Sequence, residues 1–349
     1  MRTWLIVGGV VLLMIVGFVF FQGPSPPIIV APEVVFHWGG LNVTNTMFTS
    51  WIVVGLLVLI AVIAGPRMSV VPSGFSGVVE AALSAFFDMA ENVVGERNAR
   101  KFFPLVATIF FFILLSNYIG LLPMNNIVGR PEPGVGDKQA VLQQASFAGI
   151  DFAYIPLNPT EVDTGAGDQI LLPEGVEAHG AESGHGEAIE RTTDGTFSGI
   201  IAPFFRSVMT DVNAPLAIAI FSFVFVEFWG FQALGFGYLK KFFNFGAILR
   251  LRPSGLIDVF VGILELMSEF IRMVSFTFRL FGNVFAGEVL LLMMSFLVPF
   301  VLVVVFYGLE LFVGLIQAFV FAMLTLVFAQ MAVTVHGDDH QEEETGAAH

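Results

Sequence analysis

The chain has 349 residues, of which 56% are hydrophobic and only 13% are charged. An average soluble domain carries about 25% charged residues, so this chain has too little charge to cover a water-facing surface. It contains no cysteine, which excludes disulfides, thiolate metal sites and cysteine nucleophiles. The formal net charge of -14 comes mostly from one insert and the C-terminal tail, and no basic stripe is available for nucleic acid. This composition predicts a multi-span membrane protein.

Six apolar stretches, each long enough to cross about 30 Å of hydrocarbon, organise the chain. They cover residues 4–21, 48–65, 102–123, 215–239, 255–297 and 301–335. The first follows Arg2 and precedes GPSPP, and because no small-residue cleavage site follows it, a retained anchor helix is favoured over a cleaved signal peptide. Between the second and third stretches, residues 74–97 repeat apolar side chains at helical spacing among charges, which predicts an amphipathic helix on the membrane surface.

Residues 124–206 differ in character from the apolar stretches. They contain 12 acidic and 4 basic residues, many Gly and Pro, and no strong hydrophobic period, which predicts a water-exposed insert. Lysine and arginine gather beside the amphipathic helix and at residues 240–252, so by the positive-inside rule these loops are cytoplasmic and the insert is extracytoplasmic. His179, Glu182 and His185 have a metal-ligand spacing, but their acidic, Gly-rich surroundings favour a solvated loop, and we expect no metal or cofactor.

The predicted fold is an all-α membrane protein with about five core helices, an extra N-terminal helix, a surface amphipathic helix and a C-terminal hairpin of two long tilted helices. Residues 255–297 would form a helix of roughly 64 Å, about twice the hydrocarbon thickness, and since no proline interrupts them we expect a tilt rather than a break. The predicted regions are 1–46 (anchor or signal helix and outer linker), 47–123 (first core spans with the surface helix), 124–206 (acidic insert), 207–254 (third core span and basic loop), 255–335 (tilted hairpin) and 336–349 (acidic tail).

Polar and ionisable side chains recur inside the last two apolar stretches, where each arginine or aspartate at the centre of a helix costs about 2.5–3.5 kcal/mol. Two series keep a seven-residue spacing and hence one helix face: Glu265, Arg272 and Arg279, extended by Asn283, and Glu310 with Gln317. Membrane helices tolerate such groups when they pair, line water or carry ions. Arginine keeps its proton whereas carboxyl groups bind and release protons, so the layout predicts a proton path containing a fixed cation.

Structural ion pairs are the alternative interpretation of these groups. Glu288 follows Arg279 by about 2.5 turns, too far for contact along one helix, which favours a functional role for both. Glu269 and Arg272 are spaced for a simple pair at i and i+3, so for Glu265, Glu269 and Arg272 the structural and functional interpretations stay equally open. Three small residues favour close helix approach, either to a partner or inside the chain: Gly282, Ala286 and Gly287.

The stretch SFTFRLFGNVFAGE at residues 275–288 closely resembles the signature of the a subunit of F-type ATP synthases. Four more stretches agree in order, FFPLVATIFFFILLSNYIGLLP, TDVNAPLAIAI, IDVFVGILELMSEFIRMVSF and IQAFVFAMLTLVFAQMA, so the resemblance covers most of the chain from about residue 47. It implies a non-catalytic stator subunit in a bacterial inner (plasma) membrane. This subunit faces the c-ring, contacts b-type peripheral stalk subunits and membrane lipid, and leaves nucleotide hydrolysis to its partners.

By position, the resemblance implies that Arg279 is the essential arginine that separates two offset half-channels. It assigns the proton path to Glu288, Asn283, Glu310, Gln317, Asn213, Asp211, Asn117, Glu265, Arg272 and Ser275. Glu227 stands where relatives are often neutral. An ion-coupled secondary transporter is the alternative function, although the inverted repeats and broken helices typical of that class are not visible in the sequence. A purely structural scaffold leaves Arg279 and Glu288 unexplained.

Overall fold

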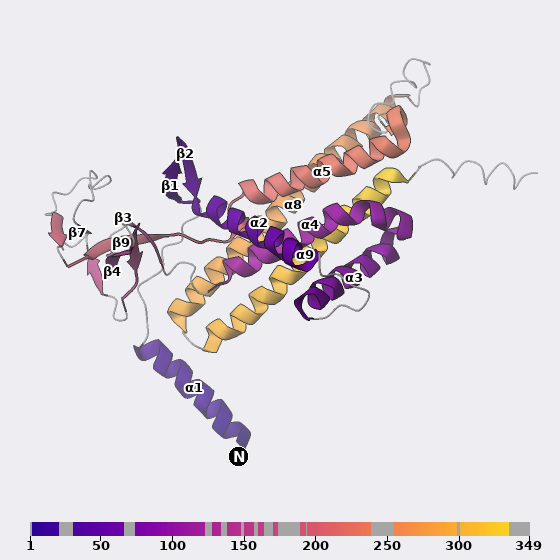
Figure 1. The fold of residues 1–349 in the computed structure, drawn as a ribbon. Coiled ribbons are helices and arrows are strands. Elements are labelled where there is room, and N and C mark those ends of the chain that lie inside the picture. Colours follow the sequence, from indigo (N-terminus) through magenta and orange to yellow (C-terminus); the bar gives the residue numbers. More distant parts are fainter. Residues whose placement is uncertain are drawn as a thin grey trace, which may run out of the picture. The chain divides into compact units, whose positions relative to one another are not determined.

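The computed structural model describes residues 2–20, 31–65, 74–122, 128–133, 138–147, 150–156, 160–163, 170–173, 189–192, 194–238, 255–298 and 301–334. Within these ranges lie seven α-helices (Figure 1): α1 (Arg2–Phe20), α2 (Asn45–Ala64), α3 (Gly74–Val94), α4 (Glu96–Gly120), α5 (Asn213–Leu234), α8 (Gly255–Leu297) and α9 (Val301–Val333). Five of them, α2, α4, α5, α9 and the Val259–Leu297 part of α8, are long and apolar enough to cross a membrane. This confirms the predicted helical membrane protein with five core spans.

Helices α8 and α9 have 43 and 33 residues and are drawn in orange and yellow in Figure 1. Helix α8 is continuous over its whole length, as the absence of proline predicted. Both helices exceed the roughly 20 residues of an upright crossing, a length that supports the predicted tilt. Helix α1 is apolar over Val7–Val19 and largely exposed, and its role as a membrane anchor stays a prediction.

The predicted amphipathic segment forms α3. It buries Phe86, whose ring stacks on Phe110 of α4 with the centroids 4.6 Å apart, and leaves Met89 exposed. Gly95 then adopts a φ of 77°, the left-handed conformation that favours glycine after a helix end, and turns the chain directly into α4. One face of α3 therefore packs on α4, and the other is available to a membrane surface.

The acidic insert contains β-strands that hydrophobic periodicity did not reveal. Five of them form an antiparallel sheet in the order β5-β3-β9-β4-β6, with the bounds β3 (Val128–Pro133), β4 (Lys138–Phe147), β5 (Ile150–Tyr154), β6 (Glu161–Asp163) and β9 (Thr196–Pro203). A parallel pair, β7 (Ile170–Pro173) and β8 (Ile189–Thr192), and a hairpin of β1 (Val34–Trp38) and β2 (Leu41–Thr44) complete the described strands. The sheet buries a small core of Leu142, Ala153 and Phe197.

The chain divides into two compact units, called unit 1 and unit 2 below. Unit 1 comprises residues 1–55, 115–211 and 282–315, and unit 2 comprises residues 56–114, 212–281 and 316–349. The insert strands belong to unit 1 and α5 to unit 2, whereas α2, α4, α8 and α9 each contribute residues to both.

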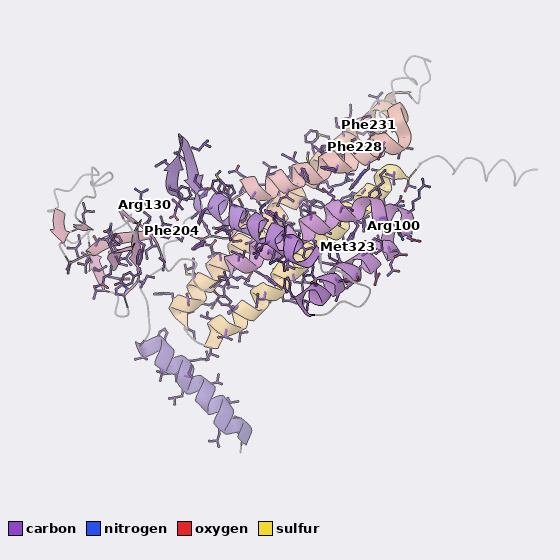
Figure 2. The ribbon with its side chains drawn as sticks, in the orientation of Figure 1. Arg100, Arg130, Phe204, Phe228, Phe231 and Met323 are labelled. Atoms are coloured by element: carbon purple, nitrogen blue, oxygen red, sulfur yellow. The ribbon has the colours of Figure 1, made fainter. Side chains whose placement is uncertain are left out.

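Aromatic side chains hold the helices of unit 2 together. The rings of Phe276 on α8 and Phe321 on α9 lie 4.7 Å apart between centroids, and Phe321 is fully buried. Close packing of this kind is the main force between helices in lipid, where the hydrophobic effect is absent. Phe228 and Phe231 on α5, labelled in Figure 2, are exposed, as expected where a membrane span meets lipid.

Candidate functional site

A buried ion pair joins Arg206 and Glu288 in unit 1. The Nε of Arg206 lies 3.3 Å from both carboxylate oxygens of Glu288, and the two side chains are only 5% and 17% exposed. The Nη1 of Arg206 also donates to the carbonyl of Ala31, and its backbone N–H donates to Oγ1 of Thr49. Removing one partner of a buried pair costs about 3–5 kcal/mol, so this arginine and this glutamate depend on each other.

Sequence reasoning missed Arg206 because it counted this residue among the charges of the insert. The residue follows the end of β9 and precedes the short 3-10 helix η2 (Val208–Thr210), in the segment that leads into α5. The neighbouring Ser207 packs against Gly120 at the end of α4, where a Cβ would collide with the serine. A single arginine within the apolar run FFRSVM was the signal that this charge is buried and paired.

The carboxylate of Glu310 on α9 packs directly against Gly287 of α8. A Cβ on Gly287 would overlap the carboxylate, so the helices need glycine at this position to accommodate the acid. By contrast, nothing lies within 4 Å of a Cβ built on Gly282, and Ala286 is exposed. Of the three small residues, Gly287 therefore serves packing inside the chain.

Three further predicted residues lie in unit 1. Asn117 is buried on α4 and donates through Nδ2 to the carbonyl of Gly314 on α9 at 3.3 Å. Asp211 accepts a hydrogen bond from Oγ1 of Thr46, the second residue of α2, at 3.1 Å. Asn283 is exposed on α8. Among the predicted residues, unit 1 thus contains the carboxylates of Glu288 on α8, Glu310 on α9 and Asp211, and the amides of Asn117 and Asn283.

Arg279 and Gln317 lie together in unit 2. The Nε2 of Gln317, which is 5% exposed, donates to the backbone carbonyl of Arg279 at 2.6 Å and so ties α9 to α8. The guanidinium carbon of Arg279 is 5.7 Å from the ring centroid of Phe276. Among the described residues of unit 2, Arg279 has no ion-pair partner, and its side chain is partly exposed.

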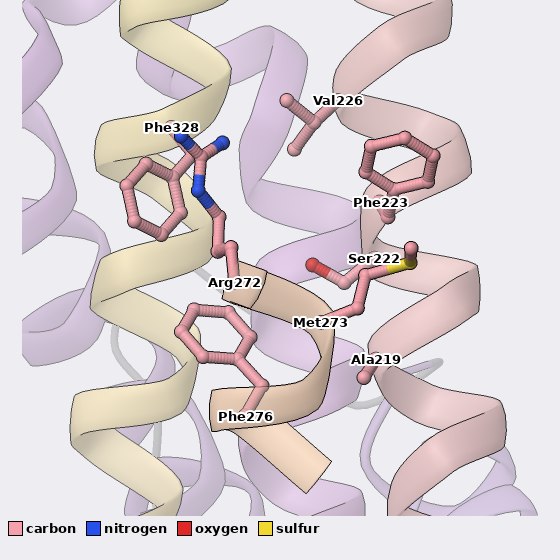
Figure 3. A pocket seen from close by; sticks show the side chains of 8 residues that line it. All are labelled: Ala219, Ser222, Phe223, Val226, Arg272, Met273, Phe276 and Phe328. Carbon is pink, nitrogen blue, oxygen red and sulfur yellow. The ribbon is translucent and has the colours of Figure 1, made fainter. Parts of the chain in front are cut away.

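Arg272 stands beside a small cavity formed by α5, α8 and α9 (Figure 3). Its Nη1 pairs with Oε2 of Glu269 at 2.6 Å, so the pair that the spacing of i and i+3 allowed is present. Its guanidinium also stacks on Phe328, with 3.6 Å from the carbon to the ring centroid. The cavity is about 10 Å³, enough for one water molecule. Ser222 of α5 also lines it, and its hydroxyl forms a hydrogen bond with the hydroxyl of Thr325 on α9 at 2.9 Å.

Glu227 on α5 faces into unit 2. Its carboxylate forms a hydrogen bond with the hydroxyl of Tyr238, which lies beyond α5 in the short 3-10 helix η3 (Gly235–Tyr238). Tyr238 is 2% exposed, and its ring packs where a Cβ on Gly230 would be. Burial, followed by the charge of Glu227, raises the pKa of the Tyr238 hydroxyl, which therefore stays a donor at physiological pH. Sequence reasoning noted Glu227 but not this partner.

The structure separates the predicted residues into two groups. Unit 1 holds Glu288, Glu310, Asn283, Asn117 and Asp211, and unit 2 holds Arg279, Gln317, Arg272, Glu265, Ser275 and Asn213. In unit 2, Glu265 is partly buried, Ser275 is exposed on α8, and Asn213 is exposed at the first position of α5. The residues with metal-ligand spacing in the insert, His179, Glu182 and His185, lie outside the described residues.

Comparisons with known proteins cover most of the chain. A model of the family described as ATP synthase A chain matches residues 47–330. A protein of Gloeobacter violaceus named ATP synthase subunit a is 28% identical over 321 residues, which is 90% of this chain and 96% of that protein. Proteins of the same name from Helicobacter acinonychis and Helicobacter hepaticus are 27% and 28% identical, over 80% and 82% of this chain and 84% and 89% of theirs. All predicted path residues fall within the matched region.

Proposed function

Because the chain belongs to the ATP synthase A chain family, we propose that it is the proton-translocating membrane subunit of an F-type ATP synthase and is not catalytic on its own. The family match over residues 47–330 and the RLFGNVFAGE motif support this function. Five helices of spanning length fit a multi-pass protein of the inner (plasma) membrane.

The outer half-channel uses the polar group of unit 1. A proton that comes from outside passes Asn117 and Asp211 and reaches Glu310 and Glu288, from which it moves to a carboxylate on the c-ring. Neutralisation lets that carboxyl rotate into lipid at low cost, whereas a charged one would meet a barrier of several kcal/mol. The location of both channel glutamates in one compact unit supports this assignment.

The inner half-channel uses the polar group of unit 2. After nearly a full turn, the ring carboxyl releases its proton toward Ser275, Glu265 and Arg272. Gln317 adds a polar group to the path. Asn213, although it belongs to unit 2, is assigned to the outer entry together with Asn117 and Asp211. Transfer of each charge through 100 mV supplies about 2.3 kcal/mol, so rotation must pool several protons for one ATP.

Arg279 keeps the two half-channels electrically separate in this proposal, and the observation that supports this role is the lack of an ion-pair partner for Arg279 among the described residues of unit 2. Its guanidinium is permanently charged and has no ion-pair partner among the described residues of unit 2, so its charge is available to a group of another subunit. A neutral ring carboxyl group that approaches the guanidinium gives up its proton, because the positive charge stabilises the resulting carboxylate anion, and a proton crossing directly is repelled.

The same proposal fixes the partners and the orientation. The chain faces the c-ring and contacts b-type peripheral stalk subunits within the ATP synthase. The basic residues Arg97, Arg100 and Lys101, in the first turns of α4, lie in the cytoplasm, and the insert lies outside the cell.

Substitution of Arg279 by alanine tests the function. We expect Arg279→Ala to abolish proton-driven ATP synthesis in membrane vesicles while the complex still assembles, since only a charge with no ion-pair partner in the described part of unit 2 is lost. Arg100→Ala is the matched control, because Arg100 forms an exposed pair with Glu96 that contributes little. Proton-coupled synthesis that survives in Arg279→Ala refutes the role of Arg279.

A further inference from the structure

Arg206 contacts three parts of the chain: the residues that precede β1, the start of α2, and α8, where Glu288 lies. Its Nη1 is fixed by the carbonyl of Ala31, and its backbone is fixed by Thr49 of α2. The Nε atom of the guanidinium lies 3.3 Å from both carboxylate oxygens of Glu288. The Ala31 contact lies before residue 47, outside the region that the family model matches.

The other acids near this site have different contacts. Asp211 accepts from Thr46, and Glu33 accepts from Nδ2 of Asn45 at 3.4 Å. Glu310 packs on Gly287, the residue that precedes Glu288 in α8. Arg206 is therefore matched to Glu288 by direct geometry, whereas the carboxylate of Glu310 rests on the glycine beside it.

We propose that Arg206 is a positioning residue for proton transfer: it anchors the Glu288 carboxylate at one place on α8, next to the Gly287 surface on which the Glu310 carboxylate lies. Glu288 then forms a fixed station for the proton beside the glycine that the Glu310 carboxylate contacts. This inference rests on the proposed function, because it assigns a role within the outer half-channel. Proton transfer is sensitive to such placement, since a shift of about 1 Å can cost on the order of a hundred-fold in rate.

Double substitution distinguishes the positioning of Glu288 by Arg206 from a general need for a positive charge at residue 206. The variants are Arg206→Gln, Glu288→Gln, the double variant and Arg206→Lys, with Arg100→Gln as the matched control at an exposed ion pair. Each is studied in the assembled ATP synthase in inverted membrane vesicles. The readouts are the amount of assembled complex and the ATP-driven proton flux per complex.

If Arg206 acts through Glu288, Arg206→Gln and Glu288→Gln each lower the flux per complex about ten-fold or more, and the double variant is no worse than either single variant. Arg206→Lys recovers flux because lysine restores the positive charge. The recovery is only partial because the lysine side chain places that charge at a different position. Arg100→Gln behaves as the unsubstituted protein.

The following results overturn the proposal. The first is unchanged flux per complex in Arg206→Gln, and the second is a double variant whose loss is the product of the single losses. If Arg206→Gln does not assemble, the double variant decides between the two roles of Arg206, since it has no uncompensated buried charge. Flux per complex at the Glu288→Gln level then supports a positioning role, and much lower flux opposes it. The third is failure of Arg206→Lys and the double variant to assemble, which assigns Arg206 to folding alone. Arg279→Ala, measured in parallel, separates these results from failure of the proposed function.

Discussion

Replacing Gly287 by alanine puts a methyl group where the carboxylate of Glu310 lies. The Oε1 atom would be 2.5 Å from the new Cβ, whereas ordinary contact begins near 3.4 Å, so the carboxylate must withdraw by at least about 0.9 Å. The clash involves the end of a flexible side chain and not the backbone. The stability cost is therefore that of an off-rotamer side chain, about 0.5–1.5 kcal/mol, and the complex assembles.

Function responds much more strongly than stability to this displacement. A shift of about 1 Å in a proton-transfer group can cost on the order of a hundred-fold in rate, so we expect Gly287→Ala to retain assembly and to lose most ATP-driven proton flux. The assay is quenching of a pH-sensitive dye in inverted vesicles, normalised to the amount of assembled complex. A second variant, Gly287→Ala with Glu310→Asp, shortens the acid by one methylene and should recover part of the flux.

Gly308 provides the matched control on α9. Nothing lies within 4 Å of a Cβ built there, so Gly308→Ala introduces the same methyl group without displacing any side chain. It should leave the flux unchanged and stabilise the helix slightly, since alanine is the better helix former by about 1 kcal/mol. The reasoning is refuted if Gly287→Ala pumps protons as well as Gly308→Ala does.

Two further predictions concern Tyr238 and the orientation of the chain. Tyr238→Phe removes a donor from the buried carboxylate of Glu227 and should destabilise the complex by about 1–3 kcal/mol, measured as a lower melting temperature. Since the pKa of Tyr238 is raised, its hydroxyl stays neutral at the pH near 10 where exposed tyrosines ionise. Equal absorbance titrations of the original chain and Tyr238→Phe through that pH confirm that the pKa is raised. A tyrosinate signal that is present in the original chain and missing from the variant contradicts it. The chain has no cysteine, so Ser146→Cys and Arg100→Cys can be labelled without background. An impermeant thiol reagent should reach Ser146→Cys in intact cells and Arg100→Cys only after permeabilisation, and the reverse pattern contradicts the proposed orientation.

The helical core was predictable because its signals are local. Apolar runs fix the spans, and the absence of proline over residues 255–297 predicts the unbroken α8 that the structure shows. The pair of Glu269 and Arg272 lies within one turn of helix, so the spacing made it one of the two open interpretations, and the structure shows the contact. The helix ends differ by a few residues from the apolar runs, since polar residues such as Glu96 still continue a helix.

The remaining features depend on contacts between distant parts of the chain. Arg206 and Glu288 are 82 residues apart, so the apolar run around Arg206 indicates a buried charge but does not identify its partner. The strands of the insert are short and interrupted by Gly and Pro, so their alternation is too brief to exceed the background, and only their pairing in the sheet defines them. The bond between Glu227 and Tyr238 depends on the turn of η3 after α5, which no periodic pattern predicts.

The arrangement of charges within each unit explains why Arg279 is suited to act on another subunit. In unit 1 the buried cation Arg206 is opposed by Glu288, and in unit 2 Arg272 is opposed by Glu269. Arg279 has no such partner among the described residues of unit 2, although an arginine in a membrane helix is costly unless an anion or water compensates it. Under the proposed function, a carboxylate of the c-ring supplies that compensation as it passes. A variant that places a new acid one turn from Arg279 should therefore block rotation as effectively as loss of the arginine, because the chain itself would then neutralise the charge that the ring requires.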